Sequence, residues 1–329
     1  MAITRRRVLQ AGAMGALSSA STLATLAQAQ TLEVGRIVVG FPAGSTVDLL
    51  ARALAKRMTG SYARSMIVDN KPGAGGQIGT TAAKAGPKDG STLLLTPMTV
   101  LGVYPHTYKS LPYDPVADFS PVGNAVTYNY AVAVGSQVPT SVTNLRQLLD
   151  WYRANPDKRN IGNPAVGSTL HFTGMLLAKA SGVDISQVNY VGPAMFTDLT
   201  GGNLPACVST LGSLLPLHNA GRLRIIATTG EARSPFVPNV ATFVESGFSD
   251  LVLKEWIAAY LPGPAPADVV ARANQALRAA LASSDISDIT TAQAQEITPS
   301  SPEELATLLR QDTESWRQRV RAVGFTATS

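Results

Sequence analysis

Glycine and hydroxyl residues stand between a predicted strand and a predicted helix at residues 40–47, an arrangement that suits the binding of an anion. Segment 36–39 is short and β-branched, which predicts a buried strand, and apolar residues recur at helical spacing from Val47 to Met58. Ser45 or Thr46 is expected to cap this helix. The unpaired N–H groups and positive dipole end of its first turn attract a carboxylate or phosphate, although an ordinary capped helix has the same signature.

A second junction of this kind lies at residues 164–171 and contains Gly167, Ser168, Thr169 and His171. Ser168 is expected to cap a helix that runs to Gly182. Because His171 falls in the first turn, the helix dipole disfavours a protonated imidazole. Two roles remain open for His171: contact with a ligand, or a neutral side chain that braces the loop.

A third junction, residues 190–194, contains Gly192 and Pro193. Proline suits the first position of a helix, and Gly192 allows the backbone to approach a ligand closely. Asp198 lies about two turns into the short helix that follows, where it is either a ligand contact or a solvated, structural carboxylate. Three such junctions in one chain favour a common function.

The glycine run at residues 73–79 does not fit a dinucleotide-binding site. A G-x-G-x-x-G motif that begins at Gly73 requires glycine at the position of Ile78. Gly75 and Gly76 are therefore expected in a tight loop that lines a cleft. The chain has no G-x-S-x-G motif, and its three histidines lack the spacing of a catalytic or metal site. We predict no metal, cofactor or catalytic residue; a secreted hydrolase with a site assembled from distant residues is the alternative.

Strand-like and helical segments alternate through the chain, which predicts an α/β protein. Residues 93–95 read as a buried strand, and residues 130–134 as the start of a new strand. The C-terminal segment begins with a capping box at Ser301 and carries an apolar stripe in which Trp316 is expected to be core.

Residues 1–29 have the features of an export signal: three consecutive arginines, a small-residue apolar segment and an A-x-A-like site that ends at Ala29. The arginine pair resembles a twin-arginine signal, although general secretion is also possible. Cleavage near Ala29 lowers the formal charge from +5 to +2, which removes the support for a basic surface, and we predict no nucleic-acid partner. The lone Cys207 excludes an internal disulfide and is expected to be buried. We therefore predict a periplasmic protein.

The chain resembles the Bug-type receptors, the extracytoplasmic solute-binding proteins of tripartite tricarboxylate transporters, over nearly its whole mature length. Residues 41–52 are similar to the F-P-P-G-G-x-T-D-x-x-A-R motif of that family, and residues 69–76 to its N-(R/K)-P-G-A-G-G loop. Residues 167–171 resemble G-S-x-x-H, residues 190–192 resemble Y-K-G, and residues 198–202 resemble D-L-x-G-G. Residues 221–233 and 237–247 are similar to two further family motifs.

The resemblance implies a two-lobed, Venus-flytrap periplasmic-binding fold in which each lobe is a mixed sheet flanked by helices. The expected lobes are residues 30–129 with 253–329, and residues 130–252. The resemblance also implies a monomeric, non-catalytic receptor that binds a small organic carboxylate between the lobes and delivers it to a membrane permease. The candidate ligand-binding residues are Phe41, Gly44, Ser45, Thr46, Asp48, Gly75, Gly76, Ser168, Thr169, His171, Gly192 and Asp198.

The chain departs from the family motifs at Ser45, Val47 and Val191, where glycine, threonine and a basic residue are usual. Loss of the basic residue and the presence of Val47 favour a less highly charged or partly apolar acid, such as an aromatic acid. Asp48 has two possible roles: contact with the amino group of an amino-acid ligand, or compensation of its own helix dipole. Dicarboxylates, aromatic acids and amino acids are thus the candidate ligands.

Overall fold

The computed structural model describes residues 32–190 and 192–326. The predicted export signal and Val191 lie outside the described residues. Ten strands form one continuous mixed sheet with the order β2-β1-β3-β9-β4-β7-β5-β6, while β8 and β10 also pair with β4. The strands are β1 (Leu32–Val39), β2 (Ala63–Asn70), β3 (Thr92–Pro97), β4 (Phe119–Val134), β5 (Asn160–Pro164), β6 (Ser186–Tyr190), β7 (Ala206–Thr210), β8 (Arg224–Thr228), β9 (Lys254–Pro262) and β10 (Gln295–Ile297).

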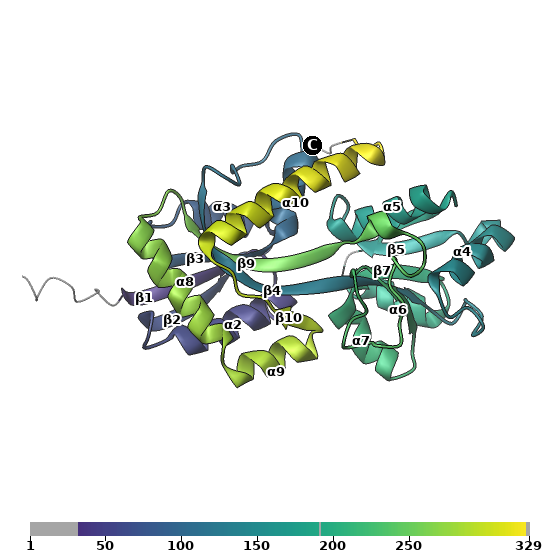
Figure 1. The fold of residues 1–329 in the computed structure, drawn as a ribbon, viewed down its shortest axis with the longest axis horizontal. Coiled ribbons are helices and arrows are strands. Elements are labelled where there is room, and N and C mark those ends of the chain that lie inside the picture. The colour runs from purple at the N-terminus through teal and green to yellow at the C-terminus, as the bar shows by residue number, and fades with distance from the viewer. Residues whose placement is uncertain (1–31, 191, 327–329) are drawn as a thin grey trace, which may run out of the picture.

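Helices cover both faces of this sheet and gather into two groups at its two ends (Figure 1). One group accompanies β1, β2 and β3, and comprises α2 (Thr46–Met58), α3 (Gln77–Lys84), α8 (Ala267–Leu281), α9 (Ser284–Ala292) and α10 (Pro302–Ala322). The other accompanies β5, β6 and β7, and comprises α4 (Leu145–Ala154), α5 (Thr169–Ser181), α6 (Ala194–Gly201) and α7 (Leu211–Asn219). The fold is the predicted two-lobed α/β architecture.

The strands β4 and β9 run between the two helix groups, and we call them the hinge strands (Figure 1). They pair in antiparallel register from Phe119↔Pro262 to Asn129↔Lys254. Beyond Asn129, β4 pairs with β7, beginning at Tyr130↔Thr210. The prediction that a new strand begins at Tyr130 was wrong, because residues 119–134 form one uninterrupted strand. Only its apolar second part was recognisable from the sequence, since proline, glycine and asparagine occupy the first part.

The turn after β3 brings the chain back toward the hinge strands through two short helical segments, η2 (Thr99–Val103) and η3 (Tyr104–His106). β3 is buried along its whole length, because helices cover both of its faces. All five residues of η2 are buried as well. The segment η2 therefore lies inside the molecule rather than on a surface loop.

Most of the helices with a predicted N-terminal cap are capped by the expected side chain. Ser45, Asn144 and Ser168 cap α2, α4 and α5, and each side chain accepts a hydrogen bond from the backbone N–H three residues on. Ser301 and Glu304 form the predicted capping box of α10. Pro193 is the N-cap of α6 rather than its first helical residue. Trp316 is 2% exposed and packs in the core, as predicted, and Cys207 is a buried free thiol.

No helix within the described part of the chain has the length and apolar character needed to cross a bilayer.

Candidate functional site

The first junction places Gly44 and Ser45 immediately before α2, with the chain in a tight turn. Gly44 has a φ of +81° and is exposed, and a Cβ built on it meets no atom within 4 Å. The Ser45 N–H donates to the carbonyl of Pro42 (3.1 Å), and the Ser45 hydroxyl accepts from the Asp48 N–H (3.4 Å). The turn therefore leaves open space in front of the first turn of α2.

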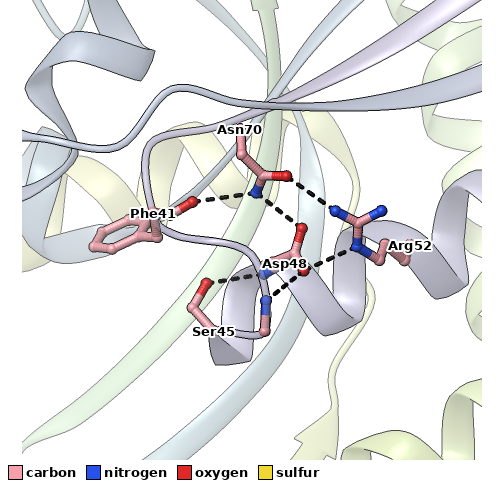
Figure 2. Close-up of polar contacts among 6 residues, drawn as sticks. Phe41, Ser45, Asp48, Arg52 and Asn70 are labelled. Atoms are coloured by element: carbon pink, nitrogen blue, oxygen red, sulfur yellow. Dashed lines mark hydrogen bonds and ion pairs between the residues drawn. The ribbon is translucent and has the colours of Figure 1, made fainter.

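Asp48 is buried beneath this turn and holds it in place (Figure 2). Its carboxylate accepts hydrogen bonds from the Gly44 N–H (2.8 Å), Arg52 Nε (2.9 Å) and Asn70 Nδ2 (2.8 Å). Asn70 also donates to the carbonyl of Phe41 (3.1 Å). Burial alone raises the pKa of Asp48, but the hydrogen bonds from Arg52, Gly44 and Asn70 outweigh burial and lower it. Both carboxylate oxygens thus have protein partners, and the geometry supports a structural role.

Some backbone N–H groups of the first junction are used within the turn, and others have no acceptor. The N–H groups of Gly44 and Ser45 are both used, as described above. Among the described residues, the N–H groups of Thr46 and Val47 have no hydrogen-bond acceptor, as expected at the first positions of a helix. The Val47 side chain, in contrast, is 5% exposed and packs in the core rather than facing the space in front of the helix. This removes the argument that Val47 signals an apolar ligand.

The glycine loop at 73–76 packs against the first junction through close backbone contacts. Gly76 has a φ of +102°, and a Cβ on it would come within 3.1 Å of the Phe41 ring and 3.2 Å of the Val100 side chain. Tyr104 donates a hydrogen bond from its hydroxyl to the carbonyl of Gly75 (3.1 Å). The predicted tight loop is present, and it packs against Val100 of η2 and Tyr104 of η3.

The second junction repeats the plan of the first. The Ser168 hydroxyl accepts from the His171 N–H (3.3 Å) and donates to the carbonyl of Pro164 (3.0 Å). The Ser168 N–H donates to the carbonyl of Ala165 (3.2 Å). Within residues 32–190 and 192–326, the N–H groups of Thr169 and Leu170 have no acceptor. The free donors of α5 are therefore those of its first two residues rather than that of the cap.

His171 braces the loop before α5. Its Nδ1 accepts a hydrogen bond from the Gly167 N–H (3.2 Å), which requires that this nitrogen carries no proton. The side chain is 6% exposed, and this burial lowers its pKa. Of the two roles left open by the sequence, the structure supports the neutral, bracing one.

The Thr169 side chain points into the protein rather than toward solvent. It is 2% exposed and its Oγ1 lies 3.0 Å from Thr99 Oγ1 in η2, 2.5 Å from the Tyr130 hydroxyl and 3.0 Å from Glu255 Oε2. Sequence reasoning missed Thr99, Tyr130 and Glu255 altogether. The available signal was Glu255 itself, an isolated acid in the otherwise apolar segment 255–262.

The segment η2 connects the first and second junctions. Its Val100 side chain lies beside Gly76, which contacts Phe41, and its Thr99 contacts Thr169 at the start of α5. The chain before α2, at Phe41, and the first residue of α5, Thr169, thus both lie near η2. This convergence is the structural basis of the candidate site.

The third junction contributes Gly192, which is exposed with a φ of +69° and has no atom within 4 Å of a Cβ built on it. Asp198 accepts a hydrogen bond from the Tyr190 hydroxyl (2.9 Å). Burial and this bond raise the pKa of Tyr190 to about 12, so the phenol stays protonated as the donor. Asp198 therefore fixes Tyr190, the last residue of β6.

A cavity of about 560 Å³ lies elsewhere, between α10, the hinge strands and the loop 230–235. Its lining includes Asn129, Lys254, Trp256 and Asp312, and none of the twelve candidate ligand-binding residues. This cavity and the three junctions are distinct places in the molecule.

Comparison with known proteins identifies the family. Residues 50–325 match the model of the tripartite tricarboxylate transporter family receptor. The chain belongs to this receptor family. The receptor is 32% identical over 321 residues to the UPF0065 protein in the tcbD–tcbE intergenic region of a Pseudomonas species, an alignment that covers 97% of the receptor and 94% of the relative.

Solved structures agree with this assignment. The periplasmic binding protein BugD has a TM-score of 0.78 and 27% identity, covering 90% of the receptor and 99% of that chain. An R. palustris protein solved with adipate has a TM-score of 0.81 and 27% identity, covering 92% of the receptor and 100% of that chain. These comparisons confirm the predicted fold and the predicted family of periplasmic solute-binding receptors. Membership in a receptor family also confirms that the protein is not an enzyme.

Proposed function

We propose that this receptor binds a small aliphatic dicarboxylate between its lobes through backbone N–H groups at the N-termini of α2 and α5. The observation that carries the proposal is that each of these helix ends has two N–H groups that lack an acceptor among the described residues. The segment η2 contacts Thr169 at the start of α5 and lies beside Gly76, which contacts Phe41 in the loop before α2. A helix N-terminus attracts a carboxylate through these donors and through its dipole. Two such ends suit a ligand with two carboxylates.

The geometry gives less support to the other candidate ligands. An amino acid would need a free carboxylate near the first junction, but both Asp48 oxygens already accept hydrogen bonds from the protein. An aromatic acid was favoured by Val47, whose side chain is buried in the core. The adipate in the R. palustris structure, which has 27% identity to this chain, is an aliphatic dicarboxylate and is consistent with the class proposed.

The pairing of the strands supports the proposed lobe boundaries. β4 pairs with β9 up to Asn129 and with β7 from Tyr130, and the β9 partner of Asn129 is Lys254. These positions support lobes of residues 30–129 with 253–329 and of residues 130–252. Rotation about the hinge strands would bring the two helix ends together on a ligand, which favours closure only if both lobes contact it.

The family and the N-terminal sequence support the remaining steps of the proposed function. A signal cleaved near Ala29 would export the chain to the periplasm, where the loaded, monomeric receptor delivers its ligand to a tripartite tricarboxylate-type permease. Uptake of a radiolabelled dicarboxylate by cells with and without the receptor gene tests this delivery step. Equal uptake in both strains contradicts it.

A thermal-shift measurement tests the ligand class. Adipate is compared with its diamide, which has the same length and no charge, and with benzoate and aspartate. We expect adipate or a shorter dicarboxylate to stabilise the receptor, by about 2.7 kcal/mol when its concentration is a hundredfold above Kd. Equal stabilisation by the diamide, or a response to benzoate or aspartate alone, contradicts the proposal.

A further inference from the structure

A glutamate side chain is buried in the middle of the sheet, on one of the two hinge strands. Glu255 lies on the hinge strand β9 and is 2% exposed. Its Oε1 accepts from the Thr99 N–H (3.0 Å), and its Oε2 lies 2.5 Å from Thr99 Oγ1, 2.5 Å from the Tyr130 hydroxyl and 3.0 Å from Thr169 Oγ1. These four residues, here called the Glu255 cluster, come from η2, β4, α5 and β9. One carboxyl group therefore ties together both hinge strands, the turn after β3 and the first residue of α5.

The number of protons in the cluster indicates the charge state of Glu255. Five pairs of oxygen atoms lie within hydrogen-bond distance: three involve Glu255 Oε2, and two join Thr169 Oγ1 to the hydroxyls of Thr99 and Tyr130. Three hydroxyl groups supply three protons, which satisfy at most three of these pairs. A proton on Glu255 satisfies a fourth. The geometry is therefore better satisfied by a neutral carboxylic acid than by a carboxylate.

Within residues 32–190 and 192–326, no positively charged side chain forms an ion pair or hydrogen bond with Glu255. The titratable groups that face it are phenols: Tyr128 and Tyr130 from β4, and Tyr104 from η3. On α5 the nearest titratable side chain is His171, whose neutral Nδ1 accepts from Gly167. Lys254 precedes Glu255 in β9, and alternation along the strand turns it to the opposite face, where it lines the 560 Å³ cavity. Burial accordingly raises the pKa of Glu255, although its hydrogen bonds oppose this.

Thr169 makes the cluster relevant to binding. It is the first residue of α5, and its own N–H is one of the two free donors of the second junction. We propose that neutral Glu255 is a positioning residue that holds the N-terminus of α5 against η2, so that ionisation of Glu255 releases this helix end and weakens ligand binding. This inference rests on the proposed function, because it assigns to Glu255 the placement of one of the two helix ends that bind the ligand.

The expected pH dependence has a definite sign. In the ligand-free protein the cluster is assembled and burial raises the Glu255 pKa, so the group is protonated below that raised value. Adipate binding has its full strength below the raised pKa and weakens as the pH rises above it, because an ionised Glu255 must take up a proton before α5 returns to its place against η2. Above that pKa the affinity for adipate should fall by up to about tenfold per pH unit.

The experiment compares wild type, E255Q and the exposed control E296Q. The glutamine carries no charge and retains a donor in the carboxyl position, so E255Q should bind within about threefold of wild type at low pH, which corresponds to one weak neutral hydrogen bond. E255Q should lose the pH slope, whereas E296Q should keep it. Thr169→Val, which cuts the link to α5 while preserving side-chain volume, should weaken binding at all pH values and also remove the slope.

An infrared difference spectrum of ligand-free wild type minus E255Q tests the charge state without any ligand. We expect the carbonyl stretch of a protonated carboxylic acid near neutral pH, and its loss on alkalinisation. A carboxylate band throughout overturns the inference, as does equal pH dependence of adipate binding in wild type and E255Q. If adipate binds with a flat pH profile, this inference fails and the proposed function stands. If no acid binds but the protonated band is present, the proposed function fails and the neutral state of Glu255 stands.

Discussion

The ring of Phe325 lies edge-on to the imidazole of His171, with centroids 6.0 Å apart. Phe325 also packs against Phe172, with centroids 5.1 Å apart. Farther along α5, Lys179 Nζ hydrogen-bonds the carbonyl of Ala322 at the end of α10. The C-terminal end of α10 and Phe325 just beyond it thus contact α5 in both its first and its last turn, and chain segments about 150 residues apart share one interface.

Replacing Phe325 with alanine should loosen this interface. Phe325 is half-buried, so loss of its contacts should lower the free energy of unfolding by about 1–2 kcal/mol. Urea denaturation measures this change, and Phe325→Leu, which retains most of the apolar area, serves as the control. Equal stabilities of the alanine variant and wild type would show that the contact contributes nothing.

His171 should make the protein sensitive to acid. Because burial lowers its folded-state pKa below the unfolded value of about 6.5, the unfolded chain binds its proton first, and stability falls as the pH drops below that value. His171→Gln should therefore lose less stability than wild type between about pH 7 and pH 5. His218→Gln, at the end of α7, is the matched control, and an identical decline in wild type and the His171 variant would refute this account.

Asp48 should stabilise the first junction through its charge. Asp48→Ala leaves the Gly44 N–H and the Asn70 amide without their acceptor and should cost about 1–3 kcal/mol at neutral pH. The Asp48 pKa is lowered, so its contribution is present above the unfolded pKa of about 3.9 and is lost as the pH falls through the folded value. The exposed Asp150, which pairs with Arg153, provides the control variant Asp150→Ala. A cost no larger than that of Asp150→Ala would remove Asp48 from the supporting structure.

Gly44 and Gly60 form a matched pair. They have φ values of +81° and +83°, and neither has an atom within 4 Å of a built Cβ. Alanine at either position should cost about 1–2 kcal/mol because the left-handed conformation is strained for other residues. Gly44→Ala alone should also weaken adipate binding, since its Cβ enters the space in front of α2. Calorimetric titration measures this, and equal affinities in the two variants would place the ligand elsewhere.

The local parts of the site were predictable from the sequence. Capping residues act on backbone groups within three positions of themselves, so Ser45, Ser168 and Ser301 could be assigned without knowledge of the fold. The buried Trp316 followed from helical periodicity in the same way. The family resemblance then gave the two-lobed architecture.

Contacts between distant segments were not predictable. The four residues of the Glu255 cluster come from positions 99, 130, 169 and 255, and no local pattern joins them. Likewise, the sequence places Gly44, Ser45 and Val47 together at the first junction. It does not reveal that the first two N–H groups are used within the turn or that the Val47 side chain enters the core.

The central claim is that backbone N–H groups at the start of α2 and α5 bind the ligand. Thr46→Pro removes one such donor at the first helical position, where proline is tolerated, and the preceding Ser45 already has the extended conformation that proline requires. Ser284→Pro makes the same change at the start of α9, away from the site. Calorimetric titration with adipate should show about a tenfold or greater loss of affinity for Thr46→Pro and none for Ser284→Pro. Unchanged affinity in a folded Thr46→Pro variant would contradict the account.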